Sequence, residues 1–250
     1  MRPAVFLRLG QSGQGEIGQS RIGGTPDLPA SLAWPQYTTA LKGYYAFLLQ
    51  INLAELPQFA ANPLPTQGML YLFTNDEGSA ADQLRFYDGG EPLQPAALPA
   101  GAQTYVDWID DLLPYRLEFA LAPDLPRWAT NDYSELTEQL GTEEKLDDLG
   151  CALSQGSIGK LLGHVAGIGH DPRQDAYVVK DVNPAWLYDY EQRGKLDMAN
   201  AQRWVNLIML DTIREVDLMF GDAGYLHVLI DRDDLARHDF SRLYASIESS

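Results

Sequence analysis

Short apolar runs bounded by proline or glycine characterise the first half of the chain. Residues 44–51 (YYAFLLQI) and 68–73 (GMLYLF) are apolar or aromatic at consecutive positions rather than at alternate ones. Such runs are typical of strands that are buried on both faces and joined by loops. We therefore predict a β-rich first half, with a further strand over 4–9.

The second half mixes strand patterns with stronger helix signals. Asn183-Pro184 supplies a cap followed by proline at the first helical position, which predicts a helix over 185–193. Amphipathic spacing predicts the other helices, and apolar runs predict the strands. The expected helices are 134–140, 144–153 and 233–247, and the expected strands are 176–179, 204–210 and 225–230.

Proline is distributed unevenly along the chain. Thirteen of the 15 prolines lie at or before Pro126. This change in texture divides the chain into a β-rich N-terminal unit, 1–126, and a β-rich C-terminal unit with helices, 127–250. We expect the two units to form one compact domain.

Similar strings recur in the two units and suggest an internal duplication. Residues 48–52 (LLQIN) resemble 207–211 (LIMLD), and 68–73 (GMLYLF) resemble 224–229 (GYLHVL). A third pair, Ile22-Gly23-Gly24 and Leu162-Gly163-His164, keeps the same order. Chance similarity between two β-rich halves is the alternative explanation. The expected fold class is mainly β with peripheral α-helices (α+β), with two similar units about a pseudo-twofold axis.

The composition fits a folded acidic protein. Among 250 residues, 45% are hydrophobic and 21% are charged, with 18 Lys and Arg against 35 Asp and Glu, so the formal net charge is −17. Such an acidic surface repels phosphate, so we expect neither nucleic acid nor membrane as a partner. The single cysteine, Cys151, excludes an intrachain disulfide and a four-cysteine zinc site within one chain. No stretch approaches the length of a membrane span, and we expect a cytoplasmic protein.

Two nucleotide-binding motifs fail on their context. Residues 13–18 (GQGEIG) match G-x-G-x-x-G, but the prolines and glycines that follow exclude the helix that a dinucleotide site requires. Residues 154–161 (SQGSIGKL) resemble a phosphate-binding loop without its first glycine and its final Ser or Thr. We expect Lys160 to be a solvated loop residue.

The metal-like clusters have simpler explanations. His164 and His170 are six residues apart among glycines, and turn chemistry accounts for the Asp-Pro that follows them. Residues 231–234 (DRDD) lack the glycine and glutamate of a calcium loop, and Asp233 or Asp234 fits a helix cap better. We predict no metal and no cofactor.

Several ordered segments resemble the bacterial YwqG-like family, which has no established function. The segments are 20–24 (SRIGG), Pro26, 28–29 (LP), 34–35 (WP), 49–52 (LQIN), 68–70 (GML), 219–224 (MFGDAG), 234–235 (DL) and 240–241 (FS). The resemblance implies a β-rich fold with a duplicated core. Phe220 and Met209 depart from the Trp and Gln that the family tends to carry, so a ligand at those positions would differ.

Five polar residues are candidates for a cleft between the two units. They are Arg21, Gln50, Tyr71, His164 and Asp222, with Asp222 or His164 as general base if chemistry occurs there. Purely structural roles are the alternative: Asp222 can be a turn residue, and Arg21 can bind loop carbonyls. Gln50 and Asn52 interrupt an apolar strand, so they must find hydrogen-bond partners. No catalytic constellation is present.

Two functions compete. The first is a non-catalytic binding module that recognises another protein with a basic surface. It depends on the charge and on the acidic segments 107–111 and 143–148, which contain interleaved apolar residues. The alternative is an enzyme or small-ligand binder with a cleft between the two units. The sequence favours the binding module, mainly because it contains no coherent catalytic motif.

Overall fold

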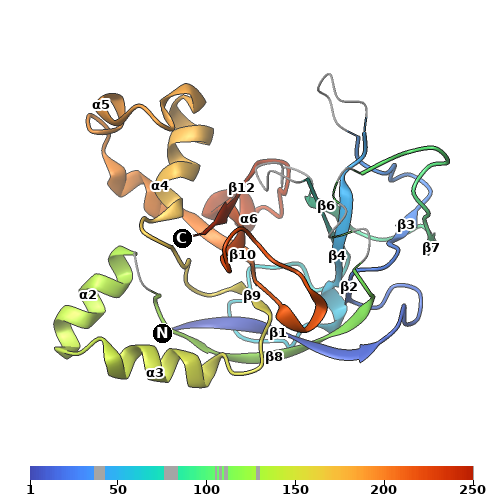
Figure 1. The fold of residues 1–250 in the computed structure, drawn as a ribbon, viewed down its shortest axis with the longest axis horizontal. Helices are drawn as coiled ribbons and strands as arrows, with labels where there is room; N and C mark the ends of the chain where they lie inside the picture. The colour runs from blue at the N-terminus through green and yellow to red at the C-terminus, as the bar shows by residue number, and fades with distance from the viewer. Residues whose placement is uncertain are drawn as a thin grey trace.

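An antiparallel sheet dominates the structure, a computed structural model that describes residues 1–36, 43–75, 84–104, 106, 109, 112–127 and 130–249 (Figure 1). Within these residues the sheet has ten strands in the order β12-β11-β10-β9-β1-β8-β2-β4-β5-β6, and β3 pairs with β7 separately. The strands are β1 Arg2–Ser12, β2 Arg21–Ile22, β3 Asp27–Pro29, β4 Ala46–Asn52, β5 Met69–Thr74, β6 Leu84–Tyr87, β7 Leu93–Pro95, β8 Tyr115–Asp124, β9 Gly159–Leu162, β10 Trp204–Asp211, β11 Tyr225–Asp231 and β12 Leu243–Glu248.

Helices lie mainly in the second half of the chain. In Figure 1, α2 and α3 form a hairpin beside β1 and β8, while α4 and α5 lie together at another corner. Within the described residues, no helix combines the length and the apolar composition needed to cross a membrane. The helices are α2 Asn131–Leu140, α3 Glu144–Leu153, α4 Pro172–Tyr177, α5 Tyr190–Arg193 and α6 Arg232–Ala236, with 3-10 helices Leu53–Glu55, Pro184–Trp186, Met198–Arg203 and Arg214–Val216 and a π-helical turn Val178–Val182.

The pair formed by β1 and β8 is the centre of the sheet. These strands are paired from Arg2 opposite Asp124 to Ser12 opposite Tyr115. Strands β9, β10, β11 and β12 follow on the side of β1, and β2, β4, β5 and β6 follow on the side of β8. We call these two sets the C-terminal arm and the N-terminal arm.

The sheet is curled until its two edges approach each other. The ring of Phe86 on the edge strand β6 lies 4.8 Å from the ring of Phe240, which precedes the opposite edge strand β12. The nearly closed sheet surrounds one hydrophobic cluster to which both arms contribute. Fully buried members of this cluster include Val5, Leu7, Ile22, Leu49, Ile51, Leu70, Leu161, Ile208, Leu210 and Val228.

The outer face of each arm is covered by the segment inserted after its first strand. In the N-terminal arm, Tyr71 and Phe73 pack with Leu28 and with the indole of Trp34. In the C-terminal arm, Trp204 and Leu229 pack against Ala176 of α4. Both faces of the central strands are therefore buried, which explains their continuous apolar runs.

Most predicted elements are confirmed, including a mainly β fold. The runs at 44–51, 68–73, 204–210 and 225–230 form β4, β5, β10 and β11, and the helices at 134–140 and 144–153 are α2 and α3.

Two predicted elements are wrong and one is split. Residues 176–179 are helical, because Asp171 caps a helix that Pro172 begins and that continues through Val178–Val182. The helix expected over 233–247 ends at Ala236, and β12 follows it. His238 has a left-handed backbone (φ 56°) that breaks the helical pattern. Residues 185–193 contain a 3-10 turn and α5 rather than one helix.

Candidate functional site

Three of the five candidate residues meet around Asp27 in the N-terminal arm. The Arg21 guanidinium lies 2.8 Å from the Asp27 carboxylate, and Gln50 Nε2 donates to the same carboxylate at 3.0 Å. Gln50 Oε1 accepts from the Asp27 amide at 2.8 Å, and Tyr71 Oη donates to the Asp27 carbonyl at 2.6 Å. These side chains are at most 2% exposed. Burial is the main cause that raises the pKa of Tyr71 above its usual value.

This cluster binds protein groups and holds the loop after β2. Arg21 Nε donates to the Thr25 carbonyl at 3.0 Å, as expected for an arginine that binds loop carbonyls. Gln50 Nε2 also donates to the Gln19 carbonyl at 2.8 Å. Asn52 Nδ2 donates to the Gly18 carbonyl at 2.9 Å. The prediction that Gln50 and Asn52 find partners is confirmed. The hydrogen bonds of this cluster all go to other groups of the protein, which is the geometry of a structural role.

The other two candidates lie in the C-terminal arm. His164 follows β9, and β1 and β8 separate β9 from β2, where Arg21 lies. Asp222 is exposed in the turn before β11. The structure thus brings together Arg21, Gln50 and Tyr71 but places His164 and Asp222 apart from them.

Lys160 is buried, so the expectation of a solvated loop residue is wrong. It lies on β9, is 1% exposed, and its Nζ contacts Asp124 Oδ2 at 2.5 Å. Burial lowers the pKa of the Lys160 ammonium, and the carboxylate of Asp124 opposes that shift. The same Asp124 oxygen accepts the backbone amide of His164 at 2.7 Å, which fixes the chain as it leaves β9.

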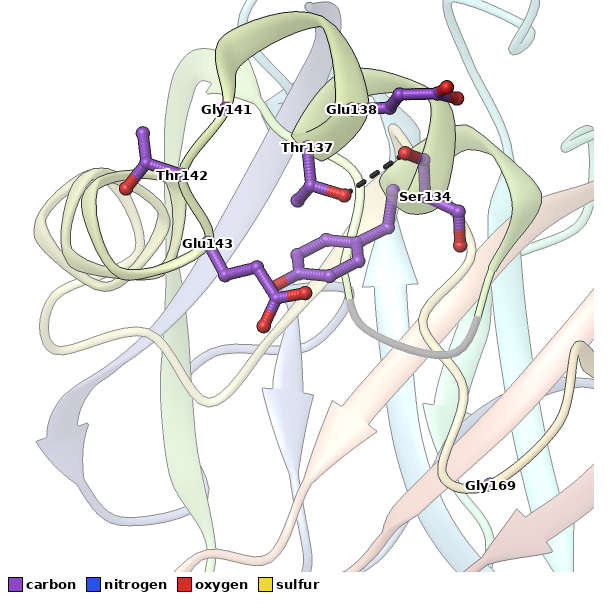
Figure 2. A pocket seen from close by; sticks show the side chains of 8 residues that line it. Ser134, Thr137, Glu138, Gly141, Thr142, Glu143 and Gly169 are labelled. Atoms are coloured by element: carbon purple, nitrogen blue, oxygen red, sulfur yellow. Dashed lines mark hydrogen bonds between the residues drawn. The ribbon is translucent and has the colours of Figure 1, made fainter.

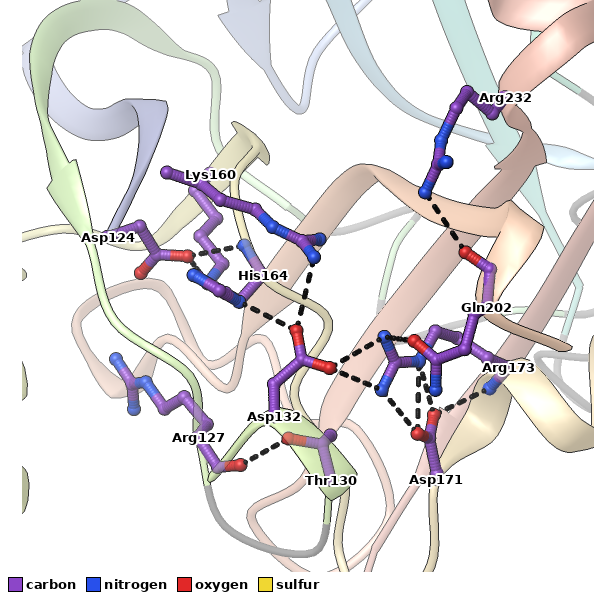
Figure 3. A network of polar contacts seen from close by, with 11 residues as sticks. Asp124, Arg127, Thr130, Asp132, Lys160, His164, Asp171, Arg173, Gln202 and Arg232 are labelled. Carbon is purple, nitrogen blue, oxygen red and sulfur yellow. Dashed lines mark hydrogen bonds and ion pairs between the residues drawn. The ribbon is translucent and has the colours of Figure 1, made fainter. Parts of the chain in front are cut away.

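Asp132, in the first turn of α2, is the centre of a polar network (Figure 3). Its Oδ2 lies 3.2 Å from His164 Nδ1 and 3.2 Å from a guanidinium nitrogen of Arg2, and its Oδ1 lies 3.3 Å from Arg173. The hydrogen bond with His164, helped by the positive charges of Arg173 and Arg2, holds the pKa of Asp132 well below its usual range. The network fixes the beginning of α2 against β1 and α4.

Arg173 extends this network, although no sequence pattern singled it out. Its side chain is 2% exposed, lies 2.5 Å from the Asp171 carboxylate and donates to Gln202 Oε1 at 2.8 Å. Asp171 also caps α4 by accepting the Arg173 amide at 3.1 Å. The Asp-Pro-Arg string was the available signal, because Asp before Pro marks a helix start.

The hairpin of α2 and α3 is also held by contacts between its two helices and by contacts of both helices with the residues after β8. Tyr133 Oη of α2 donates to Asp147 Oδ1 of α3 at 3.1 Å. Burial, together with that bond, raises the pKa of Tyr133 to about 12. Tyr133, Leu146 and Leu125 form a small hydrophobic cluster under the hairpin. The inner face of the hairpin is therefore fixed by both polar and apolar contacts.

The outer face of the hairpin is acidic. We call this surface the acidic face and define it by the exposed acids of residues 135–148. The exposed base within that range is Lys145. Two large apolar side chains accompany the acids, Leu140 at 55% exposure and Leu149 at 45%. The acids are Glu135, Glu138, Glu143, Glu144, Asp147 and Asp148, of which Asp147 also reaches the inner side to accept the Tyr133 hydroxyl.

This face contains the predicted acidic segment 143–148. The other predicted acidic segment, 107–111, has Asp107, Asp110 and Asp111 outside the described residues. Ile109 is described and is buried.

A groove of about 600 Å³ lies where the two helices of the hairpin meet (Figure 2). Glu138 and Glu143 line it, together with the hydroxyl-bearing residues Ser134 and Thr137. Gly141, with a left-handed φ of 66°, ends α2 and turns the chain toward α3. The groove thus combines carboxylates and hydroxyls, a lining suited to a positively charged side chain.

The metal-like clusters of the sequence are occupied by internal contacts. His170 Nε2 lies 2.9 Å from Asp175, and this bond raises the pKa of His170. Asp231, rather than Asp233 or Asp234, caps α6 by accepting the Asp233 amide at 2.8 Å. Across the described residues, no group of three or more His, Cys, Asp or Glu is arranged to hold a metal ion.

These features define a mainly β protein with a nearly closed sheet and an acidic helical hairpin. Residues 20–248 match the model of a family described as a domain of unknown function, DUF1963. Because the match covers most of the chain, the protein belongs to this family. No curated protein matches the chain.

Proposed function

We propose that this chain is a cytosolic, non-catalytic binding module that recognises a protein with a basic surface through the acidic face of the hairpin. The observation that supports this function is the distribution of charge on a fixed support. Six exposed acids surround one exposed base, Lys145, on helices whose inner side is held by Asp132, Tyr133 and Leu146. A fixed surface loses little conformational freedom when a partner docks.

The energetics require a partner that makes several contacts. Each exposed ion pair contributes only about 0–1 kcal/mol, and salt screens it. Long-range attraction would mainly accelerate association, and burial of Leu140 and Leu149 would add to affinity. The groove between Glu138 and Glu143 gives one Lys or Arg of the partner a defined position.

The experiment compares two variants that lose the same charge. In the hairpin variant, Glu135, Glu138, Glu143 and Glu144 become Gln. In the control variant, four exposed acids elsewhere are neutralised: Glu16→Gln, Asp88→Asn, Glu118→Gln and Glu191→Gln. Each protein serves as bait in a lysate of the organism that encodes it, and captured proteins are purified and titrated back.

The proposal predicts a basic protein that binds the wild type and the control variant with similar affinity. The hairpin variant should bind it at least tenfold more weakly, mainly through a slower and less salt-dependent association rate. Equal loss in both variants would reduce the effect to net charge. Capture of no stoichiometric basic partner by the wild type would refute the proposed function.

We also propose that the two arms arose by internal duplication. Leu48 interrupts the register between β4 and β5 as Leu207 does between β10 and β11, at the separation of 159 residues seen in the sequence. The amide of Leu53 donates to the Gly68 carbonyl at 2.9 Å, and the amide of Thr212 donates to the Gly224 carbonyl at 3.1 Å. Shared irregularities support common descent more strongly than shared strands do.

The strand register indicates a different offset for the third pair of similar strings, Ile22-Gly23-Gly24 and Leu162-Gly163-His164. Gln50 and Met209 are equivalent residues of the first pair of strings, so the residues opposite them should also be equivalent. Arg21 is opposite Gln50, and Lys160 is opposite Met209, so Arg21 corresponds to Lys160. The separation of this pair is then 139 residues rather than the 140 of the sequence comparison. We further propose membership of the YwqG-like group within the family. An alignment of many family members should reproduce these offsets in each sequence, and their absence would argue against the duplication.

A further inference from the structure

A second pocket, of about 400 Å³, lies at the mouth of the nearly closed sheet. Phe59 and Pro63, from the segment between β4 and β5, form one wall, and Val205 of β10 and Leu235 of α6 form another. Leu235 belongs to the interior hydrophobic cluster, and Phe59 and Val205 pack against it. The pocket therefore joins the two arms and reaches the apolar interior, and a mainly apolar concavity with a few polar groups is typical of small-ligand sites.

The charge of this pocket is opposite to that of the whole molecule. Arg2 and Arg232 line it, and no acidic residue is among the described residues that do so. Arg232 donates to the Gln202 carbonyl at 3.2 Å, a neutral partner, while Arg2 contacts Asp132 at 3.2 Å. A guanidinium has five N–H donors, so both side chains retain donors for a ligand.

Asn206 is a buried polar residue in the lining. It is 1% exposed, and its Nδ2 donates to the Leu162 carbonyl at 2.7 Å. Its Oδ1 is buried and has no hydrogen-bond partner in the part of the chain described. An unpaired buried acceptor is costly, so Asn206 Oδ1 marks a place for a water molecule in the lining.

We propose that this pocket binds a small amphipathic anion, a carboxylate with a short apolar tail. The tail would lie between Phe59, Val205 and Leu235, and the carboxylate would accept hydrogen bonds from Arg232 and Arg2. Guanidinium and carboxylate match in geometry as well as in charge. The inference is independent of the acidic face, which lies on a different part of the molecule and has the opposite charge.

Calorimetric titration of the full chain with four probes tests the chemistry. The probes are octanoate, hexanoate, neutral octanol and the cationic octyltrimethylammonium. We expect saturable one-to-one binding of octanoate, weaker binding by about fourfold for each methylene removed, weaker binding of octanol and none of the cation. Equal binding of the anion and the cation, or no saturable binding of octanoate, would overturn the proposal.

Variants then locate the site. Arg232→Gln should weaken octanoate by about tenfold or more and leave octanol unchanged, because octanol does not use the charge. Arg8→Gln, on an exposed arginine of β1, is the matched control and should change neither affinity. Val205→Trp should abolish binding of both probes by filling the pocket, while an unchanged circular dichroism spectrum reports an intact fold. Undiminished octanoate binding in Arg232→Gln or in folded Val205→Trp would refute the assignment.

Discussion

Arg21 on β2 and Lys160 on β9 are buried cations, one in each arm, and each is paired with a buried aspartate. The Arg21 guanidinium lies 2.8 Å from Asp27, and the Lys160 ammonium lies 2.5 Å from Asp124. Both cations are 1% exposed. A charge removed from water to this extent depends on its partner, so neither member of a pair can be replaced alone without a large loss of stability.

The Lys160–Asp124 pair gives the first prediction. Lys160→Met should lower the free energy of unfolding by about 3–5 kcal/mol, because it leaves the Asp124 carboxylate buried without a counter-charge. Adding Asp124→Asn should recover much of that loss, since an amide oxygen can still accept the His164 amide. Urea unfolding measures both. The exposed Lys145→Met is the control, and a loss below about 1 kcal/mol in Lys160→Met would contradict the assigned role.

His227 gives a prediction about pH. It is fully buried on β11, both ring nitrogens lack partners among the described residues, and burial lowers its pKa to about 3. The unfolded chain takes up a proton near pH 6.5 and the folded chain does not, so the stability contribution of His227 is lost as pH falls from about 6.5 toward 3. His227→Phe should therefore lose about 2 kcal/mol less than the wild type between pH 7.5 and pH 5.

His170 provides a control of opposite sign for that experiment. Its pKa is raised, mainly by Asp175, so its contribution is present below its unfolded pKa and is lost as pH rises through the folded value. His170→Gln should therefore lose more stability than the wild type on acidification. Chemical denaturation at several pH values measures both variants, and parallel curves for His227→Phe and the wild type would disprove the first effect.

Two glycines should respond in opposite ways to the same substitution. Gly150 lies within α3, and a Cβ added there would meet no heavy atom within 4 Å, so Gly150→Ala should stabilise the protein by about 0.5–1 kcal/mol. A Cβ at Gly224 would overlap the Glu248 carbonyl on β12, so Gly224→Ala should destabilise by about 1–3 kcal/mol. Thermal unfolding compares them, and a shift of the same sign would be inconsistent with the packing.

Asp132 anchors the first turn of α2, so its replacement should loosen the hairpin. Asp132→Asn removes the charge that Arg173, Arg2 and His164 share, and should cost about 1–3 kcal/mol. Hydrogen exchange followed by mass spectrometry should show faster exchange in α2, because its first turn loses its anchor. Asp148→Asn, on the exposed side of the same hairpin, should leave exchange unchanged. Equal protection of α2 in the two variants would show that apolar packing alone holds the helix.

Sequence patterns predicted the parts of the fold that depend on local chemistry. The apolar runs of β4, β5, β10 and β11 are continuous and shorter than a typical helix, so they favour strands. Proline and glycine bound the runs of the first half. The valines at 178–179 favoured a strand, but the cap at Asp171 and Pro172 began a helix that includes them. For the helix predicted over 233–247, the structure confirms the start. The left-handed backbone at His238 prevents the helix from continuing.

The site depended on partners that sequence spacing does not reveal. Lys160 looked like a loop residue because glycines surround it, and its counter-ion, Asp124, is 36 residues away. Arg173 and Asp132 are separated by 41 residues and meet only because α2 folds back beside α4. The acidic segment 143–148, in contrast, could be predicted from the sequence, because its acids are consecutive or nearly so and belong to a predicted amphipathic helix. In the structure its acids are exposed and Leu146 is its one buried residue.

The central position of β1 also dictates an order of events during synthesis. One flank of β1 can pair as soon as β8 has left the ribosome, but the other flank must wait for Gly159–Leu162. Until then its backbone amides and carbonyls form an open edge in the middle of the future sheet, where another chain could pair. Docking of β9 closes that edge and offers its own free side to β10, beyond which β11 and β12 complete the sheet.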